Sequence, residues 1–199
     1  MFEFTEYIGI IAFAMSGFFV AVRNKLDLLG ILVATFLTAL GGGITRDIVV
    51  GNTPYTFTHD LPAIMVISVI LLMILFKLHK KDSIENKPLF IISDSIGLVS
   101  FSITGALIAL ENNLNFTGVL ALSFITAVGG GIARDIIINQ VPFIFKTGFY
   151  GTVSLLVAIF VYFAHQYDVI NIYTIFAIFI FSVSIRVIGF YKKWSVPIL

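Results

Sequence analysis

Seven long stretches of the chain carry no charged residue, and they constrain the fold more than any other feature. Each is 16 to 19 residues long, close to the roughly 20 residues that a helix needs to cross a bilayer core. They also lack the two-residue alternation of a membrane β-barrel. The sequence therefore predicts an all-α polytopic membrane protein, a single membrane domain over 1–199, with seven transmembrane helices at 7–22, 28–45, 61–76, 95–110, 115–133, 147–164 and 169–185.

Charge and residue types exclude several classes of function. The formal net charge is only +1, so no basic excess exists to bind a nucleic-acid backbone. The chain has no cysteine, and His59 and His165 lie near helix ends without other ligand residues, so we expect no cofactor and no bound metal. Ser16 lacks the surroundings of a serine nucleophile. We therefore expect a membrane protein that is not an enzyme.

The basic residues predict the orientation of the chain. Only Arg46 falls on the side of the membrane opposite the others, and Arg134 and Arg186 share the half of the majority. By the positive-inside rule, the C-terminus is cytoplasmic and the N-terminus is outside. The loops and tail that set this orientation hold Arg23, Lys25, Lys77, Lys80, Lys81, Lys87, Lys146, Lys192 and Lys193.

The chain repeats itself without a gap at an offset of 88 residues, the separation of Gly9 from Gly97. The strongest match is Gly-Gly-Gly-Ile-Thr-Arg-Asp at 41–47 against Gly-Gly-Gly-Ile-Ala-Arg-Asp at 129–135, with a proline seven residues after each block. Each unit holds three predicted spans, and an odd number of spans inverts the second copy. The sequence therefore predicts a 3+3 inverted repeat, 6–78 and 94–165, with a seventh helix at 169–191 outside it.

Each glycine triplet lies near the middle of the membrane in span 2 or span 5. Three consecutive glycines weaken a helix by about 1 kcal/mol each relative to alanine, so we expect a kink or break there. Freed backbone groups are tolerated only inside protein or along a water-filled cavity. Close packing of two helices is the alternative use of small residues. The triplets are Gly41, Gly42, Gly43, Gly129, Gly130 and Gly131.

Ionisable residues follow each triplet at a depth where they are rare and usually functional. Because adjacent residues on a helix do not face one another, we expect Arg46 not to pair simply with Asp47. Topology instead suggests Glu6 as the partner of Arg46. In the second repeat, the predicted pair is Asp94 with Arg134, next to Asp135. A structural ion pair that locks helices together is the alternative.

Seven spans, the repeat and the doubled Gly-Gly-Gly-x-x-Arg-Asp block resemble prokaryotic members of the trimeric intracellular cation (TRIC) channel family. The resemblance implies a homotrimer in the prokaryotic plasma membrane, surrounded by lipid. Each protomer would have its own pore, lined by spans 2 and 5 and kinked at the glycines. The permeating ion would be a monovalent cation, chiefly potassium, with sodium as the second candidate.

Two other functions remain open. A secondary transporter of a small metabolite such as glycine would use the same inverted repeat and broken helices. A non-conducting structural protein would leave the buried Arg-Asp blocks without a task. In the channel interpretation, backbone carbonyls and hydroxyls near Thr38 and Thr126 replace part of the ion's hydration shell. Nearby carboxylates must then neutralise the arginines, which would otherwise repel cations.

Overall fold

The computed structural model of the chain describes residues 2–78, 88–146 and 149–194, and these residues form helices without a strand. The prediction of an all-helical protein is confirmed for this part of the chain. Its helices are α1 (Phe2–Arg23), α2 (Leu28–Val49), α3 (Tyr55–Thr58), α4 (Leu61–Leu75), α5 (Pro88–Glu111), α6 (Phe116–Ile137), α7 (Phe143–Lys146), α8 (Gly151–Gln166) and α9 (Ile172–Tyr191).

A helix lies on each of the seven predicted stretches. Five of them, α1, α2, α5, α6 and α9, are long and apolar enough to cross a membrane. The other two are shorter, with 15 residues in α4 and 16 in α8. The four-residue helices α3 and α7 were not predicted.

Equivalent side chains start α2 and α6. The carboxylate of Asp27 accepts a hydrogen bond from the backbone N–H of Gly30 at 2.8 Å, and the amide oxygen of Asn115 accepts one from Gly118 N at 2.9 Å. Such caps satisfy N–H groups that have no partner within the helix. The two caps lie 88 residues apart, so the repeated sequence produces the same local structure in both places.

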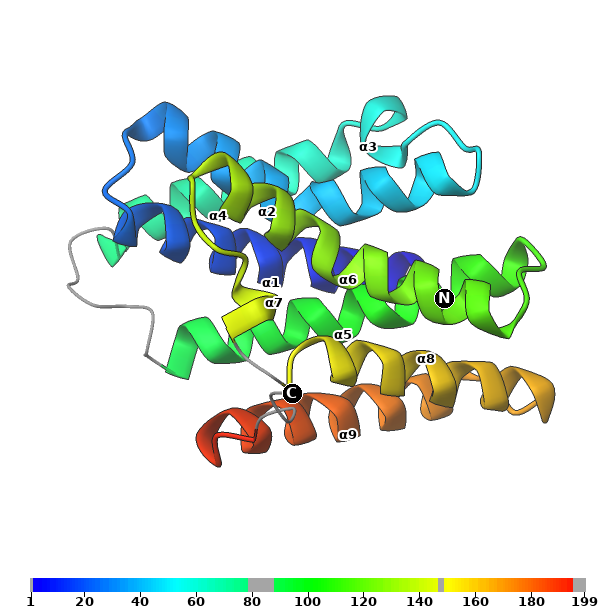
Figure 1. The fold of residues 1–199 in the computed structure, drawn as a ribbon. Helices are drawn as coiled ribbons and strands as arrows, with labels where there is room; N and C mark the ends of the chain where they lie inside the picture. Colours follow the sequence, from blue (N-terminus) through cyan, green and yellow to red (C-terminus); the bar gives the residue numbers. More distant parts are fainter. Residues whose placement is uncertain (1, 79–87, 147–148, 195–199) are drawn as a thin grey trace.

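Helices α1 and α5 form the centre of the bundle, where they lie side by side and run in opposite directions (Figure 1). Helix α2 packs on α1 and α6 packs on α5, while α2 and α6 also pack against each other. Helices α4 and α8 lie outside these pairs, and α9 packs on α5 and α8. The bundle therefore buries α5 most deeply and leaves α9 largely on its periphery.

Contacts between the two halves are reciprocal. The position of a Cβ on Gly9 lies 3.2 Å from the Phe101 ring, and that of a Cβ on Gly97 lies 2.2 Å from the Phe13 ring. The two phenylalanines, themselves 88 residues apart, stack with their ring centroids at 5.4 Å. Equivalent residues thus make equivalent contacts across the boundary between the two halves.

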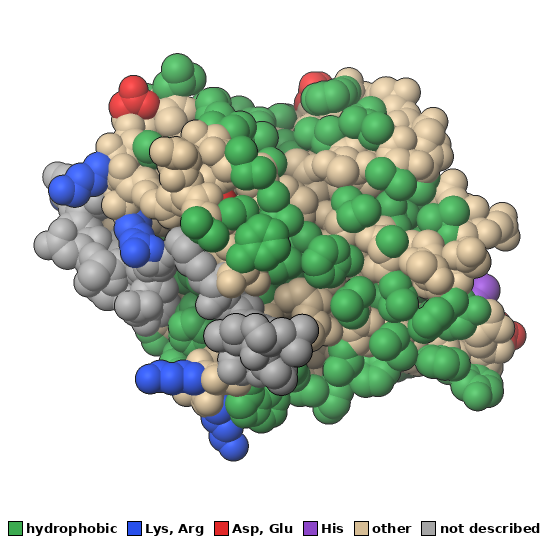
Figure 2. Space-filling model, in the orientation of Figure 1, with side chains coloured by type: hydrophobic (Ala, Val, Ile, Leu, Met, Phe, Trp, Pro, Cys, Tyr) green, Lys and Arg blue, Asp and Glu red, His purple; other side chains and the backbone are tan. Residues whose placement is uncertain are grey.

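The outer surface is largely apolar, as expected of a protein surrounded by lipid. Hydrophobic side chains cover much of the face seen in Figure 2, and the Lys and Arg side chains visible there gather at its left end. The ends of α1, α4 and α9 lie at this end in Figure 1. The described part of the structure does not include three of the basic residues used for the orientation, Lys80, Lys81 and Lys87, nor the side chain of Lys146.

Candidate functional site

The glycine triplets lie where α2 and α6 cross, and neither triplet interrupts its helix. Helix α2 is continuous over Leu28–Val49, and α6 is continuous over Phe116–Ile137. The expectation of a break is therefore wrong, because helix packing outweighs the low helix propensity of glycine. A kink at the triplets stays a prediction.

At the crossing, the two backbones touch. A Cβ on Gly42 would lie 2.0 Å from the carbonyl oxygen of Thr126, and a Cβ on Gly130 would lie 2.5 Å from that of Thr38. A Cβ on Gly41 would come within 3.1 Å of Gly130 Cα. Only glycine permits the contacts at Gly42 and Gly130, so these two residues serve close helix packing in this conformation.

The two predicted threonines lie at the same crossing. The Thr38 hydroxyl donates to the carbonyl of Ala34 at 2.7 Å, and the Thr126 hydroxyl donates to that of Leu122 at 2.6 Å. Each threonine also faces a glycine of the neighbouring helix, Gly17 of α1 or Gly105 of α5. Both side chains are buried, so their remaining lone pairs face the protein interior.

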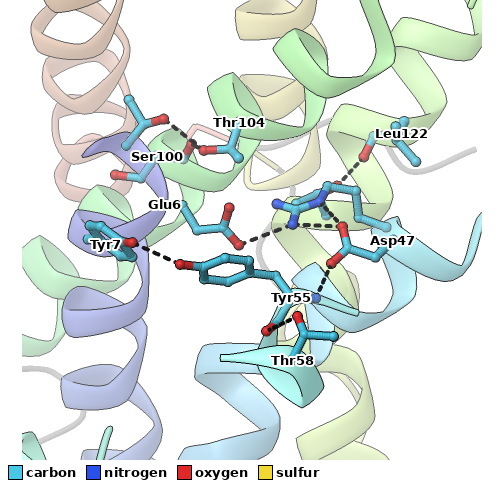
Figure 3. A network of polar contacts seen from close by, with 11 residues as sticks. Glu6, Tyr7, Asp47, Tyr55, Thr58, Ser100, Thr104 and Leu122 are labelled. Carbon is cyan, nitrogen blue, oxygen red and sulfur yellow. Dashed lines mark hydrogen bonds and ion pairs between the residues drawn. The ribbon is translucent and has the colours of Figure 1, made fainter. Parts of the chain in front are cut away.

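Arg46 is buried near the end of α2, where it contacts two carboxylates. Its Nη2 lies 3.1 Å from Glu6 Oε1, which is the pair predicted for the first repeat. Its Nε donates to Asp47 Oδ1 at 2.8 Å, so the expectation that these neighbours do not pair is wrong. A long arginine side chain can turn back to its neighbour, and burial makes an unpaired charge costly. Figure 3 shows Glu6 and Asp47 directed toward this guanidinium.

Asp47 also holds the start of α3. Its second carboxylate oxygen accepts a hydrogen bond from the backbone N–H of Tyr55 at 2.9 Å. The Tyr55 hydroxyl in turn hydrogen-bonds with that of Tyr7 on α1 at 3.1 Å (Figure 3). Sequence reasoning missed Tyr55, although the proline before it was part of the repeated pattern.

The second half repeats the arginine–aspartate contact, and the hydrogen bond from the aspartate to a short helix, at the other end of the bundle. Arg134 contacts Asp135 at 2.8 Å, and Asp135 accepts from the backbone N–H of Phe143, the first residue of α7, at 2.8 Å. Arg134 also reaches across to the Thr38 hydroxyl at 3.5 Å. The aspartate after each triplet thus ties a short helix to the end of α2 or α6.

The predicted pair of Asp94 with Arg134 is wrong, since no ion pair joins them among the described residues. Asp94 Oδ1 accepts instead from the Ser16 hydroxyl at 3.0 Å and from the Tyr150 hydroxyl at 3.4 Å. Arg134 turns toward its neighbour Asp135, as Arg46 turns toward Asp47. Sequence reasoning did not assign Tyr150 to the site.

Arg186 of α9 is a further buried charge that the sequence indicated only as a basic residue in the same half of the membrane. Its side chain is 1% exposed, and its guanidinium carbon lies 4.9 Å from the centre of the Tyr150 ring. Together with Arg134, it supplies the opposite charge that acts on Asp94. The cluster at this end therefore includes a residue from outside the repeated segments.

The two ends of the bundle differ in how open they are. A cavity of about 370 Å³ opens beside Arg46 and is lined by four carboxylates, those of Glu3, Glu6, Asp47 and Glu111. The cavity beside Arg134, lined also by Asp94, Tyr150 and Phe143, has a volume of only about 10 Å³. That is room for about one water molecule. We call them the Glu6 vestibule and the Asp94 cavity.

A family model described as "Glycine transporter" matches the chain twice, over residues 3–78 and 91–166. The chain is 30% identical to the UPF0126 membrane protein YvgT of Bacillus subtilis over 195 residues, 98% of this chain and 95% of that protein. It is 38% identical over 137 residues to a UPF0126 membrane protein of Deinococcus radiodurans, a match that spans 69% of this chain and 63% of the relative.

Solved structures share the whole fold. One, described as "Structural basis for conductance through TRIC cation channels", is 33% identical and superposes with a TM-score of 0.85, covering 100% of this chain and 97% of the other. The TRIC trimeric intracellular cation channel orthologue from Rhodobacter sphaeroides is 26% identical with a TM-score of 0.87, covering 96% and 97%.

Proposed function

This chain belongs to the family described as "Glycine transporter" and is a prokaryotic relative of the TRIC channels, and we propose that it is a channel for monovalent cations, chiefly potassium. The path runs through each protomer, from the Glu6 vestibule along the crossing of α2 and α6 to the Asp94 cavity. The observation that carries this proposal is the acidic vestibule beside Arg46, in a bundle that has the fold of a cation channel.

The charge of the vestibule suits a cation. Four carboxylates and one guanidinium, that of Arg46, line it. A cleft lined by charge of one sign raises the local concentration of the opposite ion. Because Glu6 and Asp47 are both paired with Arg46, the guanidinium is neutralised and does not repel the ion. An arginine at the mouth of the path is therefore compatible with the passage of cations.

At the crossing, the ion would exchange water for oxygen atoms of the protein. The carbonyl oxygens of Thr38 and Thr126 lie against the facing glycines, and the hydroxyls of the same threonines lie beside Gly17 of α1 and Gly105 of α5. Neutral oxygens of this kind replace part of the hydration shell of a monovalent cation. In the conformation described here, the backbones touch and the Asp94 cavity is too small for a hydrated ion, so conduction requires the helices to separate.

The assembly we infer is a homotrimer of inverted repeats. The reciprocal contacts of Gly9 with Phe101 and of Gly97 with Phe13 support a two-fold relation between the halves. The double match of one family model, again offset by 88 residues, supports it independently. The trimer is inferred from the shared fold with a protein described as trimeric.

Transport of glycine is the second candidate, and the description of the family model favours it. The Glu6 vestibule offers a guanidinium for a carboxylate and carboxylates for an ammonium group. A carrier would need to close the vestibule and open the Asp94 cavity in turn, which two repeats that rock against each other can do.

Liposomes that contain the purified chain separate the two functions. We expect a potassium gradient alone to generate a membrane potential, which a voltage-sensitive dye reports, because a channel needs no coupled substrate. Addition of glycine should leave this potential unchanged, and protein-free liposomes provide the control. Uptake of labelled glycine driven by a sodium or proton gradient, without a potential from potassium alone, would instead establish the carrier.

Labelling of single cysteines tests the proposed orientation. The chain has no cysteine, so His59→Cys and Lys192→Cys each introduce one exposed thiol. Because the basic residues gather at the end that holds Lys192, we expect a membrane-impermeant maleimide to label the His59 variant in intact cells. The Lys192 variant should react only after permeabilisation. The reverse pattern would mean that the charge bias does not set the orientation.

A further inference from the structure

The cluster around Asp94 contains a charge that the cluster around Glu6 does not match. At the Glu6 end, two carboxylates surround one guanidinium, a net charge of −1. At the other end, Arg134 pairs with Asp135, and Arg186 lies over the ring of Tyr150, whose hydroxyl donates to Asp94. The four ionised groups there have a net charge of zero. Arg186 lies outside both segments that the family model matches, so it has no counterpart in the first half.

Arg186 is an unusual residue to bury. Its Nε and Nη2 atoms have no hydrogen-bond partner in the described part of the chain, and one oxygen of Asp94 is likewise without a donor. Unpaired buried donors are costly. The guanidinium lies instead over the Tyr150 and Phe190 rings, whose centroids are 4.9 and 5.9 Å from its central carbon. Packing alone would be satisfied by an uncharged side chain of similar size.

Tyr150 connects this arginine to the proposed path. Its hydroxyl donates to Asp94, its ring lies against Arg186, and its side chain lines the Asp94 cavity. Asp94 lines the same cavity, so the charge that it presents to an ion depends on the positive charge behind Tyr150.

From this arrangement we propose that Arg186 determines the cation conductance of the Asp94 end by cancelling the negative charge of Asp94. The proposal rests on the proposed channel function and adds a residue of α9 to it. Arg186 acts through the electrostatic potential at the Asp94 cavity and does not touch the ion. The Asp94 end is thereby less attractive to cations than the Glu6 vestibule, and the two ends of the path are electrostatically unequal.

A charge series tests this role. Arg186→Gln leaves the cluster around Asp94 with a net charge of −1, Asp94→Asn leaves it at +1, and the double variant restores zero. We expect the unitary potassium conductance in dilute KCl to be highest for Arg186→Gln, lowest for Asp94→Asn, and equal to the wild type for the double variant. Arg186→Lys, which keeps the charge, should also match the wild type. One charge acting across about 10 Å of water changes the local cation concentration about twofold, which sets the smallest expected size of each step.

Salt provides a second readout that a purely structural role would not move. The differences between variants should shrink in concentrated KCl, because ions that fill the open path screen the charge of Asp94. If Arg186→Gln does not assemble, Asp94→Asn is compared with the double variant, which should conduct more. Conductances that do not follow the net charge would overturn this inference while leaving the channel intact. A wild-type protein without potassium current would instead contradict the proposed function itself.

Discussion

Alanine in place of Gly42 or Gly130 is expected to disrupt the crossing of α2 and α6. The added Cβ would lie 2.0 Å from the Thr126 carbonyl oxygen in the first case and 2.5 Å from that of Thr38 in the second. Both obstacles are backbone atoms, which cannot rotate away as a side chain can. Overpacking of this kind typically costs about 1 to 3 kcal/mol, which exceeds the gain of about 1 kcal/mol in helix propensity. We expect a lower thermal midpoint in detergent and reduced potassium conductance.

Neighbouring glycines in the same helices supply matched controls. A Cβ on Gly43 or Gly129 would meet its nearest atom at 3.5 or 3.6 Å, an ordinary contact. Gly43→Ala and Gly129→Ala should therefore keep or slightly raise the thermal midpoint. Leucine at Gly42 or Gly130 should abolish conduction because it also fills the path. If Gly42→Ala and Gly43→Ala behaved alike in stability and conductance, the close crossing would not matter for either.

Removal of the Arg46 guanidinium is expected to lower the stability of the protein strongly. Arg46→Met leaves the Glu6 and Asp47 carboxylates buried together without a positive partner. Breaking a buried ion pair on one side typically costs about 3 to 5 kcal/mol. Glu6→Gln combined with Arg46→Met should cost clearly less than the two single effects together, as measured by thermal unfolding of the purified protein.

The second half provides the comparison for this cycle. Asp94 and Arg134 occupy the equivalent positions but form no ion pair. Asp94→Asn with Arg134→Met should therefore show a smaller coupling than Glu6 with Arg46, whereas Arg134 with Asp135 should couple strongly. Equal coupling in the two halves would show that the asymmetry between their clusters has no energetic consequence.

The architecture was largely predictable because lipid imposes simple rules on sequence. The charge-free stretches of helical length coincide with α1, α2, α4, α5, α6, α8 and α9. Helix α2 extends past its stretch where a charge pair is buried, at Arg46 with Asp47. The short helices α3 and α7 were missed because four residues carry no periodic pattern. Asp47 and Asp135 hold these helices by accepting hydrogen bonds from backbone N–H groups. Almost any residue can supply a backbone N–H, so the sequence does not reveal the donor.

The site was predicted only in part, and for physical reasons. The repeat identified Glu6 as the partner of Arg46 because both lie in the same half of the membrane. The same logic failed for Asp94, since Ser16 and Tyr150 come from other helices and their contacts depend on packing that sequence spacing does not reveal. Low helix propensity suggested a break at the triplets, but the close approach of α2 and α6 favours continuous helices. Arg186 had no repeat partner to draw attention to it.

Single-channel recording distinguishes a channel from a carrier. The purified chain in a planar bilayer, with potassium chloride on both sides and no glycine, should give discrete unitary current steps. In a potassium chloride gradient, the reversal potential should lie close to that of potassium, because the acidic vestibule attracts cations. Absence of unitary steps, together with a flux that saturates at carrier turnover and requires a co-substrate, would contradict the channel and favour the transporter.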